Sequence, residues 1–344
     1  MKKVTMQTIA DELGLSKNAV SIALRGADGI SDSTRETILK KADKLGYSYK
    51  KKNDRPDIKK NIAFVASDHI FSSSLLNRSF FSHIYICLKE ETEKLGWGIS
   101  LHSITHAQIQ QKQLPIQLDT SKIDGIIILS HLTDEYIDLI INTKIPTVII
   151  DHHYPGMQAD SILTNNRFGA YSITQHLINN GHTKIGFLGN IDHSPSYQER
   201  LEGYHLAFKK ANLPLPETTF IKTDIIESDE AVDTYIKSLP ELPTAWFCVN
   251  DGLMFYTYSY LQKNGLSIPN DISLTCYDNG DLSRLTNPNI TTMDVDLHNY
   301  GRSAFQQLLW RMDNPDETYR EILLPSTLLK RESVANIAIK KQDT

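Results

Sequence analysis

The sequence has little cysteine and no long apolar segment. Its three cysteines, Cys87, Cys248 and Cys276, each fall in an apolar stretch and show no pairing pattern, which is typical of reduced thiols in a protein core. No apolar run approaches the roughly 18 residues of a membrane-spanning helix. The N-terminus turns polar directly after two lysines, unlike a secretory signal. We therefore expect a cytoplasmic protein without a membrane segment.

Signatures of catalysis are missing as well. The sequence contains no Walker phosphate loop, no dinucleotide-binding glycine pattern and no G-x-S-x-G nucleophile turn. His102 and His106 are four residues apart, but such a pair binds zinc only when it shares a helix and has a third ligand, and His102 falls in a predicted strand. We expect neither an enzyme nor a cofactor or metal site.

Charge is distributed unevenly along the 344 residues. The net charge is -5, yet residues 1–60 hold 14 Lys or Arg and 8 Asp or Glu, a local charge of +6, and the rest carries -11. A chain of this length exceeds what one hydrophobic core usually serves, so two or three domains are expected. The asymmetry favours a small polyanion-binding head on a larger body, although a basic face is often merely solvated.

The basic head carries helix start and stop signals. Thr5 can cap a first helix that Gly14 ends, and Ser16 can cap a second helix whose Val20 and Leu24 are four residues apart on one face. A third helix is expected within residues 31–47, capped by Ser31 or Ser33. Two short helices joined by a tight glycine turn and braced by a third predict a helix-turn-helix.

The outward face of the second helix suits DNA. If Val20 and Leu24 point inward, the residues that point outward are Lys17, Asn18, Ser21, Ile22 and Arg25. Asn can pair with an adenine edge, Lys and Arg can reach guanine or phosphate, and Ile can touch a thymine methyl group. A three-helix bundle with a merely charged face is the alternative.

Residues 4–26 and 30–47 together resemble the DNA-binding headpiece of the lactose-repressor (LacI/GalR) family. The matching segments read VTMQTIADELGLSKNAVSIALRG and ISDSTRETILKKADKLGY. The resemblance implies that operator DNA is contacted by Thr5, Ser16, Lys17, Asn18, Ser21, Ile22 and Arg25. Ile22 stands where the family commonly has an operator-reading Arg, and Arg25 where Asn is usual, so we expect an operator that departs from the family's typical sequence.

The segment after the head is a basic linker. Residues 49–60 are rich in lysine and contain Pro56, which is unfavourable inside a helix. We interpret this segment as a tether that contacts phosphates, with a solvated linker as the alternative. The predicted domains are thus a headpiece at 1–48, a linker at 49–60 and an effector-binding and dimerisation domain at 61–344.

The body alternates between short apolar runs and amphipathic segments. Strands are expected at residues 61–66, 98–104, 123–130, 147–151, 183–189, 244–250 and 272–278. Helices are expected at residues 80–95, 167–182, 196–213, 252–265 and 298–312. This alternation predicts α/β lobes with parallel sheets, in which ligands bind beyond the carboxyl ends of the strands. Three of the predicted strands end on the polar residues Asp151, Asn250 and Asp278.

The body resembles the same family, and with it the two-lobed periplasmic-binding-protein fold. The match includes SPSYQERLEGYHLAF, FCVND and the stretch from GLSIPND to NITTM. It implies that a small effector is bound by Arg200, Asn250 and Asp278, less securely by Asp151, and by one of the paired aromatics Phe80 and Phe81. From the residues alone, Arg200 could be a surface salt-bridge partner, Asn250 a helix cap, Asp278 a turn residue and the phenylalanines core.

The resemblance as a whole implies a regulator of transcription. We expect a homodimeric repressor of carbohydrate-use genes that binds a pseudo-palindromic operator and senses a sugar or sugar phosphate. A regulator that senses a purine or another non-sugar effector, and a cytosolic solute-binding protein with an incidental basic head, are the alternatives.

Overall fold

The computed structural model describes residues 4–25, 29–47, 59–68, 75–115, 118–129 and 132–338. The chain divides into two compact units, Met1–Lys59 and Lys60–Thr344, and each is described by itself. Residues 49–58 of the predicted linker lie outside the described residues. Within the described part, no helix is long and apolar enough to cross a membrane.

The N-terminal unit is a three-helix headpiece. Its helices are α1 (Met6–Leu13), α2 (Lys17–Arg25) and α3 (Asp32–Lys44). The Thr5 hydroxyl accepts from the backbone N–H of Thr8, whose own side chain accepts from the N–H of Thr5, and Gly14 takes a positive φ of 65° at the end of α1. Ser31, rather than Ser33, caps α3. These caps satisfy backbone groups that the helix ends leave unpaired, and the predicted helices are confirmed.

The headpiece has a small core of its own. Its fully or almost fully buried apolar side chains come from all three helices: Ile9, Ala10, Val20, Ala23, Leu24, Ile38 and Ala42. Arg35 of α3 also donates to the carbonyl oxygens of Ile22 and Ala23. The position of α2 is therefore set both by apolar packing and by hydrogen bonds from its neighbour.

The second unit contains two parallel sheets with one strand reversed. The first sheet has the order β11-β5-β4-β3-β1-β2, and the second has the order β12-β10-β9-β8-β6-β7. Among the described strands, the neighbouring pairs are parallel except β10 with β12, which is antiparallel. The first sheet consists of β1 (Asn61–Ser67), β2 (Gly98–Ile104), β3 (Gly125–Leu129), β4 (Thr147–Ile150), β5 (Asp160–Thr164) and β11 (Glu321–Leu324). The second consists of β6 (Ile185–Leu188), β7 (Ile221–Lys222), β8 (Ala245–Cys248), β9 (Ser273–Asp278), β10 (Thr291–Asp294) and β12 (Thr327–Leu329).

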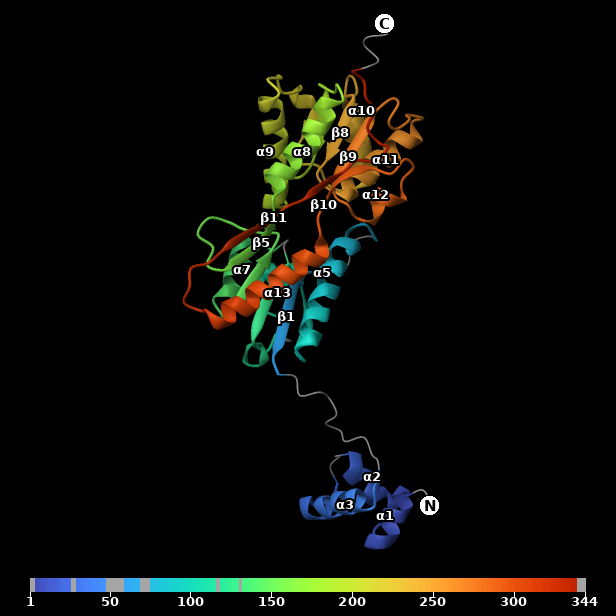
Figure 1. The fold of residues 1–344 in the computed structure, drawn as a ribbon, viewed down its shortest axis with the longest axis vertical. Helices are drawn as coiled ribbons and strands as arrows, with labels where there is room; N and C mark the ends of the chain where they lie inside the picture. The colour runs from blue at the N-terminus through green and yellow to red at the C-terminus, as the bar shows by residue number, and fades with distance from the viewer. Residues whose placement is uncertain are drawn as a thin grey trace. The chain divides into compact units, whose positions relative to one another are not determined.

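Helices cover both sheets and make two lobes. The first lobe has α5 (Leu75–Lys94), α6 (His106–Gln111), the short 3-10 helix η1 (Thr120–Lys122), α7 (Asp134–Ile141) and α13 (Leu297–Asp313). The second has α8 (Asn166–Asn179), α9 (Pro195–Lys210), η2 (Thr218–Phe220), α10 (Asp229–Ser238), α11 (Asp251–Lys263) and α12 (Asp281–Leu285). Figure 1 shows α13 lying beside α5, although the two helices are far apart in the sequence. The predicted two-lobed α/β fold is confirmed.

Three chain crossings join the lobes. The chain passes from β5 into α8, from β10 into α13 and from β11 into β12. Because the strands of each lobe are parallel, their carboxyl ends lie at one edge of each sheet. Asp151 directly follows β4, Asn250 comes two residues after β8, and Asp278 ends β9.

Candidate functional site

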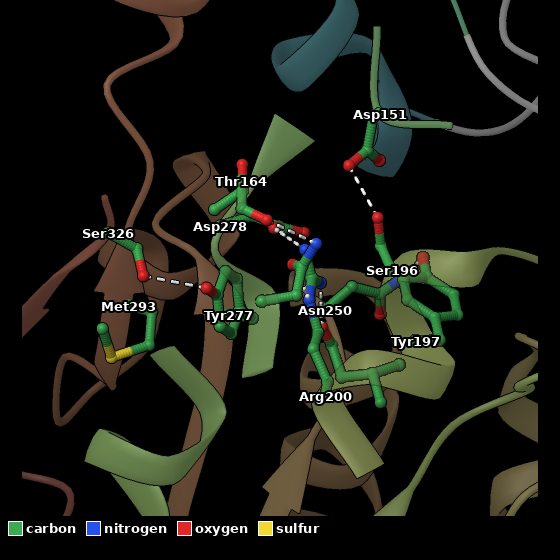
Figure 2. A network of polar contacts seen from close by, with 12 residues as sticks. Asp151, Thr164, Ser196, Tyr197, Arg200, Asn250, Tyr277, Asp278, Met293 and Ser326 are labelled. Atoms are coloured by element: carbon green, nitrogen blue, oxygen red, sulfur yellow. Dashed lines mark hydrogen bonds and ion pairs between the residues drawn. The ribbon is translucent and has the colours of Figure 1, made fainter. Parts of the chain in front are cut away.

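The first turns of α9 organise a network of polar side chains at the boundary between the lobes. Ser194 caps this helix and Pro195 occupies its first turn. Ser196 and Arg200 are four residues apart and therefore lie on one face of the helix, next to Tyr197. These three side chains contact Asp151, Asn250 and Asp278, as Figure 2 shows. We call this set, together with Glu227, the interlobe network.

Arg200 is the buried centre of the network. Its Nε donates to Asn166 Oδ1 at 2.8 Å, Nη1 donates to the carbonyl oxygen of Val249, and Nη2 donates to Asp278 Oδ1 at 3.0 Å. The side chain is only 2% exposed. The guanidinium also lies over the Tyr277 ring, with Cζ 3.8 Å from the ring centroid. A surface salt bridge, the alternative considered for this residue, is therefore wrong.

Asp278 ends β9 in an unusual backbone conformation. Its φ is 89°, a region that side chains rarely adopt, so its role in shaping the turn is real. Burial raises the pKa of its carboxyl group, and the positive charge of Arg200 acts in the opposite direction. The turn and the ion pair coexist, because the same turn directs the carboxylate at Arg200.

Asp151 links the first lobe to the second. Its Oδ1 accepts a hydrogen bond from Ser196 Oγ at 2.7 Å. Its φ of 58° again lies in the left-handed region. Burial raises the pKa of Asp151 to about 6, while Arg200 lowers it. This carboxyl group therefore loses its proton at a pH of about 6. Its charged form is a stronger hydrogen-bond acceptor for Ser196 than its neutral form.

Asn250 caps a helix and also joins the network. Its Oδ1 accepts from the backbone N–H of Leu253 at 2.9 Å, which starts α11. Its Nδ2 donates to Tyr197 Oη and to Glu227 Oε2, each at 2.8 Å. The sequence reasoning did not single out Tyr197 and Glu227 as site residues. Tyr197 stands inside the quoted SPSYQERLEGYHLAF block, whereas Glu227 comes from the loop before α10 and had no sequence signal.

The paired phenylalanines pack on each other. Phe80 and Phe81 lie on α5 with ring centroids 5.2 Å apart and planes 82° apart, an edge-to-face pair. Both are partly buried and pack against the apolar core of the body. These contacts favour the alternative that the two phenylalanines belong to the core. The four polar residues predicted for the site come together without a contact to either ring among those described.

A cavity of about 360 Å³ borders the network at Asp278. Its walls come from α5, from the turn between β9 and α12, and from the crossing between β10 and α13. Four aspartates, Asp278, Asp281, Asp294 and Asp296, line it beside one guanidinium, that of Arg284. The cavity lies between elements of both lobes, which is where a ligand can affect their relative position.

The histidines near the network make other contacts. His152 Nε2 is 2.8 Å from Asp134 Oδ1. Burial lowers the pKa of His152, and the Asp134 carboxylate acts in the opposite direction. His153 lies 3.3 Å from both Glu199 and Glu321, and the hydrogen bond with Glu199 raises its pKa. His102 lies on β2 beside Ser100. Over the described residues, no group of three or more His, Cys, Asp or Glu side chains is placed to hold a metal ion.

The headpiece exposes the face predicted for DNA contact. Lys17 and Asn18 of α2 are exposed, and Ser21 and Ile22 are partly exposed. The opposite face, with Val20 and Leu24, is buried. Thr5 and Ser16 are exposed at the helix starts, where the Ser16 hydroxyl accepts from the N–H of Ala19 at 3.1 Å. The side chain of Arg25 lies outside the described residues.

Comparisons with known proteins cover nearly the whole chain. A family model described as a periplasmic binding protein-like domain matches residues 174–334. The HTH-type transcriptional repressor PurR of Vibrio vulnificus (strain CMCP6) is 30% identical over 337 residues, which cover 97% of this chain and 99% of that repressor. The ribose operon repressor of Haemophilus influenzae is 28% identical over 338 residues, with the same coverage.

Solved structures share the fold. The lac repressor dimer bound to operator and the anti-inducer ONPF has a TM-score of 0.70 and 21% identity, covering 97% of this chain and 100% of that one. The complex of the transcriptional regulator CelR with cellobiose has a TM-score of 0.70 and 22% identity, covering 96% and 100%.

Proposed function

Because this chain belongs to the lactose-repressor (LacI/GalR) family of transcriptional regulators, we propose that it represses transcription by binding a pseudo-palindromic operator as a homodimer. In this proposal residues 1–48 read the DNA and residues 49–60 tether the head. Residues 61–344 bind a small effector and dimerise. Paired heads suit an operator with two related half-sites.

The observation that carries the proposal is the exposed face of α2. Lys17, Asn18, Ser21 and Ile22 point away from the headpiece core, while Arg35 and the buried Val20 hold the helix in place. A fixed helix with phosphate- and base-contacting side chains on its open face is the arrangement that reads a major groove. Thr5 and Ser16 lie at the helix starts, where hydroxyls and backbone amides reach phosphates.

We propose a sugar or sugar phosphate as the effector and carbohydrate-use genes as the target. The ribose operon repressor among the relatives and the CelR–cellobiose complex support this. The 30% identical relative is named PurR, so a purine is the second candidate. In either case, Asp151, Arg200, Asn250 and Asp278 are the proposed effector contacts.

The proposed mechanism has two states. Asp151 and Ser196 hold the lobes in one relative position through a hydrogen bond, and an effector that competes for either group favours another position. An effector shifts the equilibrium only by its difference in affinity for the two positions. The altered lobe position then changes the spacing of the two heads in the dimer.

A gel-shift assay tests the DNA-binding function. The protein is expected to bind a DNA fragment from upstream of its own or a neighbouring gene, and absence of binding to every such fragment at low salt would exclude the proposal. Ile22→Arg is expected to change which operator is preferred, because it replaces an apolar probe by a guanine-reading cation. Leu215→Arg, a similar change at an exposed position of the body, is the control and should leave the preference unchanged.

A further inference from the structure

The cation at the centre of the interlobe network is already engaged by the protein. The guanidinium of Arg200 donates to Asn166, Val249 and Asp278 along its edges. Tyr277 covers it at 3.8 Å and Tyr197 lies 5.4 Å from it, both measured from Cζ to the ring centroid. Arginine holds phosphate through its edges, and here those edges already meet a carboxylate, an amide and a carbonyl of the chain.

The N-terminus of α11 is also occupied. Asn250 caps this helix, and Glu227 accepts from the Asn250 amide at 2.8 Å. A Cβ atom on Gly252, in the first turn of α11, would collide with the Glu227 carboxylate. The carboxylate therefore lies across the first turn, at the end of the helix that attracts anions. Gly252 is what allows it to come so close.

The N-terminus of α9 carries a third carboxylate. Ser196 lies in its first turn and donates its hydroxyl to Asp151, and its backbone N–H donates to Ser194 Oγ. Pro195 beside it has no N–H to offer a ligand. Both helix ends that face the network are thus paired with acidic side chains of the chain itself.

The adjoining cavity is acidic as well. Asp278, Asp281, Asp294 and Asp296 line it with Arg284. The Arg284 guanidinium lies within hydrogen-bond distance of both the backbone and the side-chain oxygens of Asn279. Among the described side chains, negative charge therefore exceeds positive charge both in the network and in the cavity beside it.

We infer that the effector is a hydroxyl-rich compound without a phosphate or carboxylate group, and that Glu227 is a residue that rejects anionic effectors. This inference rests on the proposed function, which supplies the effector site. Three features could hold an anion: the Arg200 guanidinium and the N-termini of α11 and α9. Each of them is already paired with a carboxylate of the chain, from Asp278, Glu227 and Asp151 respectively. Carboxylates are acceptors for hydroxyl donors, whereas an anionic group placed against them meets like charge.

Matched pairs of probes test the inference. The pairs are ribose and ribose 5-phosphate, glucose and glucose 6-phosphate, fructose and fructose 6-phosphate, and inosine and inosine monophosphate. Thermal unfolding of the full chain identifies the probes that stabilise it, and calorimetry gives their affinities. At least one uncharged probe is expected to bind, and to bind about tenfold or more tightly than its phosphorylated partner.

Glu227→Gln tests the residue. Glutamine keeps a carbonyl oxygen to accept from Asn250 but removes the charge, so the preference for the uncharged probe is expected to fall about tenfold. Glu230→Gln removes the same charge three residues away at an exposed position and should leave the preference unchanged. The unfolding midpoint without a probe shows whether each variant is folded.

Three results would overturn the inference: tighter binding of a phosphorylated probe than of its partner, no binding of any uncharged probe, or an unchanged preference in folded Glu227→Gln. Gel-shift binding by the unliganded wild type is measured in parallel. If operator binding holds while one of these results appears, only the inference on effector charge fails. If operator binding fails, the proposed function fails first.

Discussion

At the scale of single residues, Asp251 is a buried carboxyl group of the second lobe. Asp251, in the first turn of α11, is 6% exposed and accepts from the Cys276 thiol at 3.1 Å. Its Oδ2 has no hydrogen-bond partner. Burial raises the pKa of Asp251 to about 7, and the charge of Asp278 adds to this effect. The Cys276 side chain thus gives the buried acid a hydrogen-bond donor.

The raised pKa of Asp251 predicts a pH-dependent stability. The folded state keeps this proton up to about pH 7, whereas the unfolded chain releases it near pH 4. Stability is therefore lost as the pH rises between these values, and the loss is complete above pH 7. Asp251→Asn is expected to reduce the difference in unfolding free energy between pH 5 and pH 8 by on the order of 2 kcal/mol.

Urea unfolding of the wild type and of Asp251→Asn, each at pH 5 and at pH 8, measures the change in unfolding free energy between the two pH values. Asp316→Asn, at an exposed position, is the control and should follow the wild type. An equally steep dependence in Asp251→Asn would mean that another group titrates in this range.

At the scale of elements, one buried ion pair joins α13 to β5 of the first sheet. Arg311 of α13 donates to both carboxylate oxygens of Asp160, at 2.7 and 2.9 Å, and the two side chains are 4% and 0% exposed. Asp160 begins β5 and also accepts from the N–H of Arg320, just before β11. Arg311 further donates to carbonyl oxygens of the connection between α13 and β11: those of Asn314, Pro315, Glu317 and Thr318. The pair therefore fixes where the chain turns back to form β11.

Removing one partner should be costly. Asp160→Asn leaves the Arg311 guanidinium buried without a counter-charge, so the unfolding free energy is expected to fall by roughly 3 kcal/mol. Glu202→Gln breaks the pair with Arg167, whose side chains are 54% and 40% exposed in the order Arg167, Glu202, and is expected to cost less than about 1 kcal/mol. Urea unfolding compares the two variants, and similar losses in both would show that burial does not decide the cost.

At the scale of the whole molecule, the network connects the proposed effector contacts to the crossings between the lobes. Arg200 binds Asn166 directly after the first crossing, and Tyr277 Oη lies 2.8 Å from Ser326 Oγ in the third. Asp151 and Ser196 join the lobes themselves. A ligand that competes for Asp278 would release Arg200 from one of its three partners, and through it change contacts at the crossings.

Asp278→Asn should separate effector response from DNA binding. Asparagine keeps a side-chain oxygen that can accept from Arg200, but it lacks the charge of the proposed effector contact, so an effector is expected to lose its influence on operator affinity. Affinity without effector should change by less than about threefold, which is under ~1 kcal/mol. Gel-shift titrations with and without an effector identified from the matched probes measure both quantities.

Asp313→Asn, at an exposed position that does not line the cavity, is the control and should keep both operator binding and effector response. Equal loss of both in Asp278→Asn would instead assign Asp278 a role in folding.

Local signals in the sequence determined the headpiece and most of the regular elements. The caps at Thr5, Ser16 and Ser31 and the stop at Gly14 act over a few residues, so their effect can be read without the fold. The strands β5, β7, β10, β11 and β12 and the helices α6, α7, α10 and α12 were not predicted. Strands of two to five residues carry too little periodicity, and they form only because a neighbouring strand supplies their hydrogen bonds.

The tertiary structure alone decided how the polar residues of the body are paired. The sequence placed Asp151, Asn250 and Asp278 at strand ends, because strand ends follow from local pattern. It did not indicate Glu227 or that Arg200 would be buried among Asn166, Val249 and Asp278. Such contacts join segments 30 to 80 residues apart, and which of them meet depends on the packing of two sheets and three crossings. The charge balance at the boundary between the lobes, and with it the inferred class of effector, is a property of that packing.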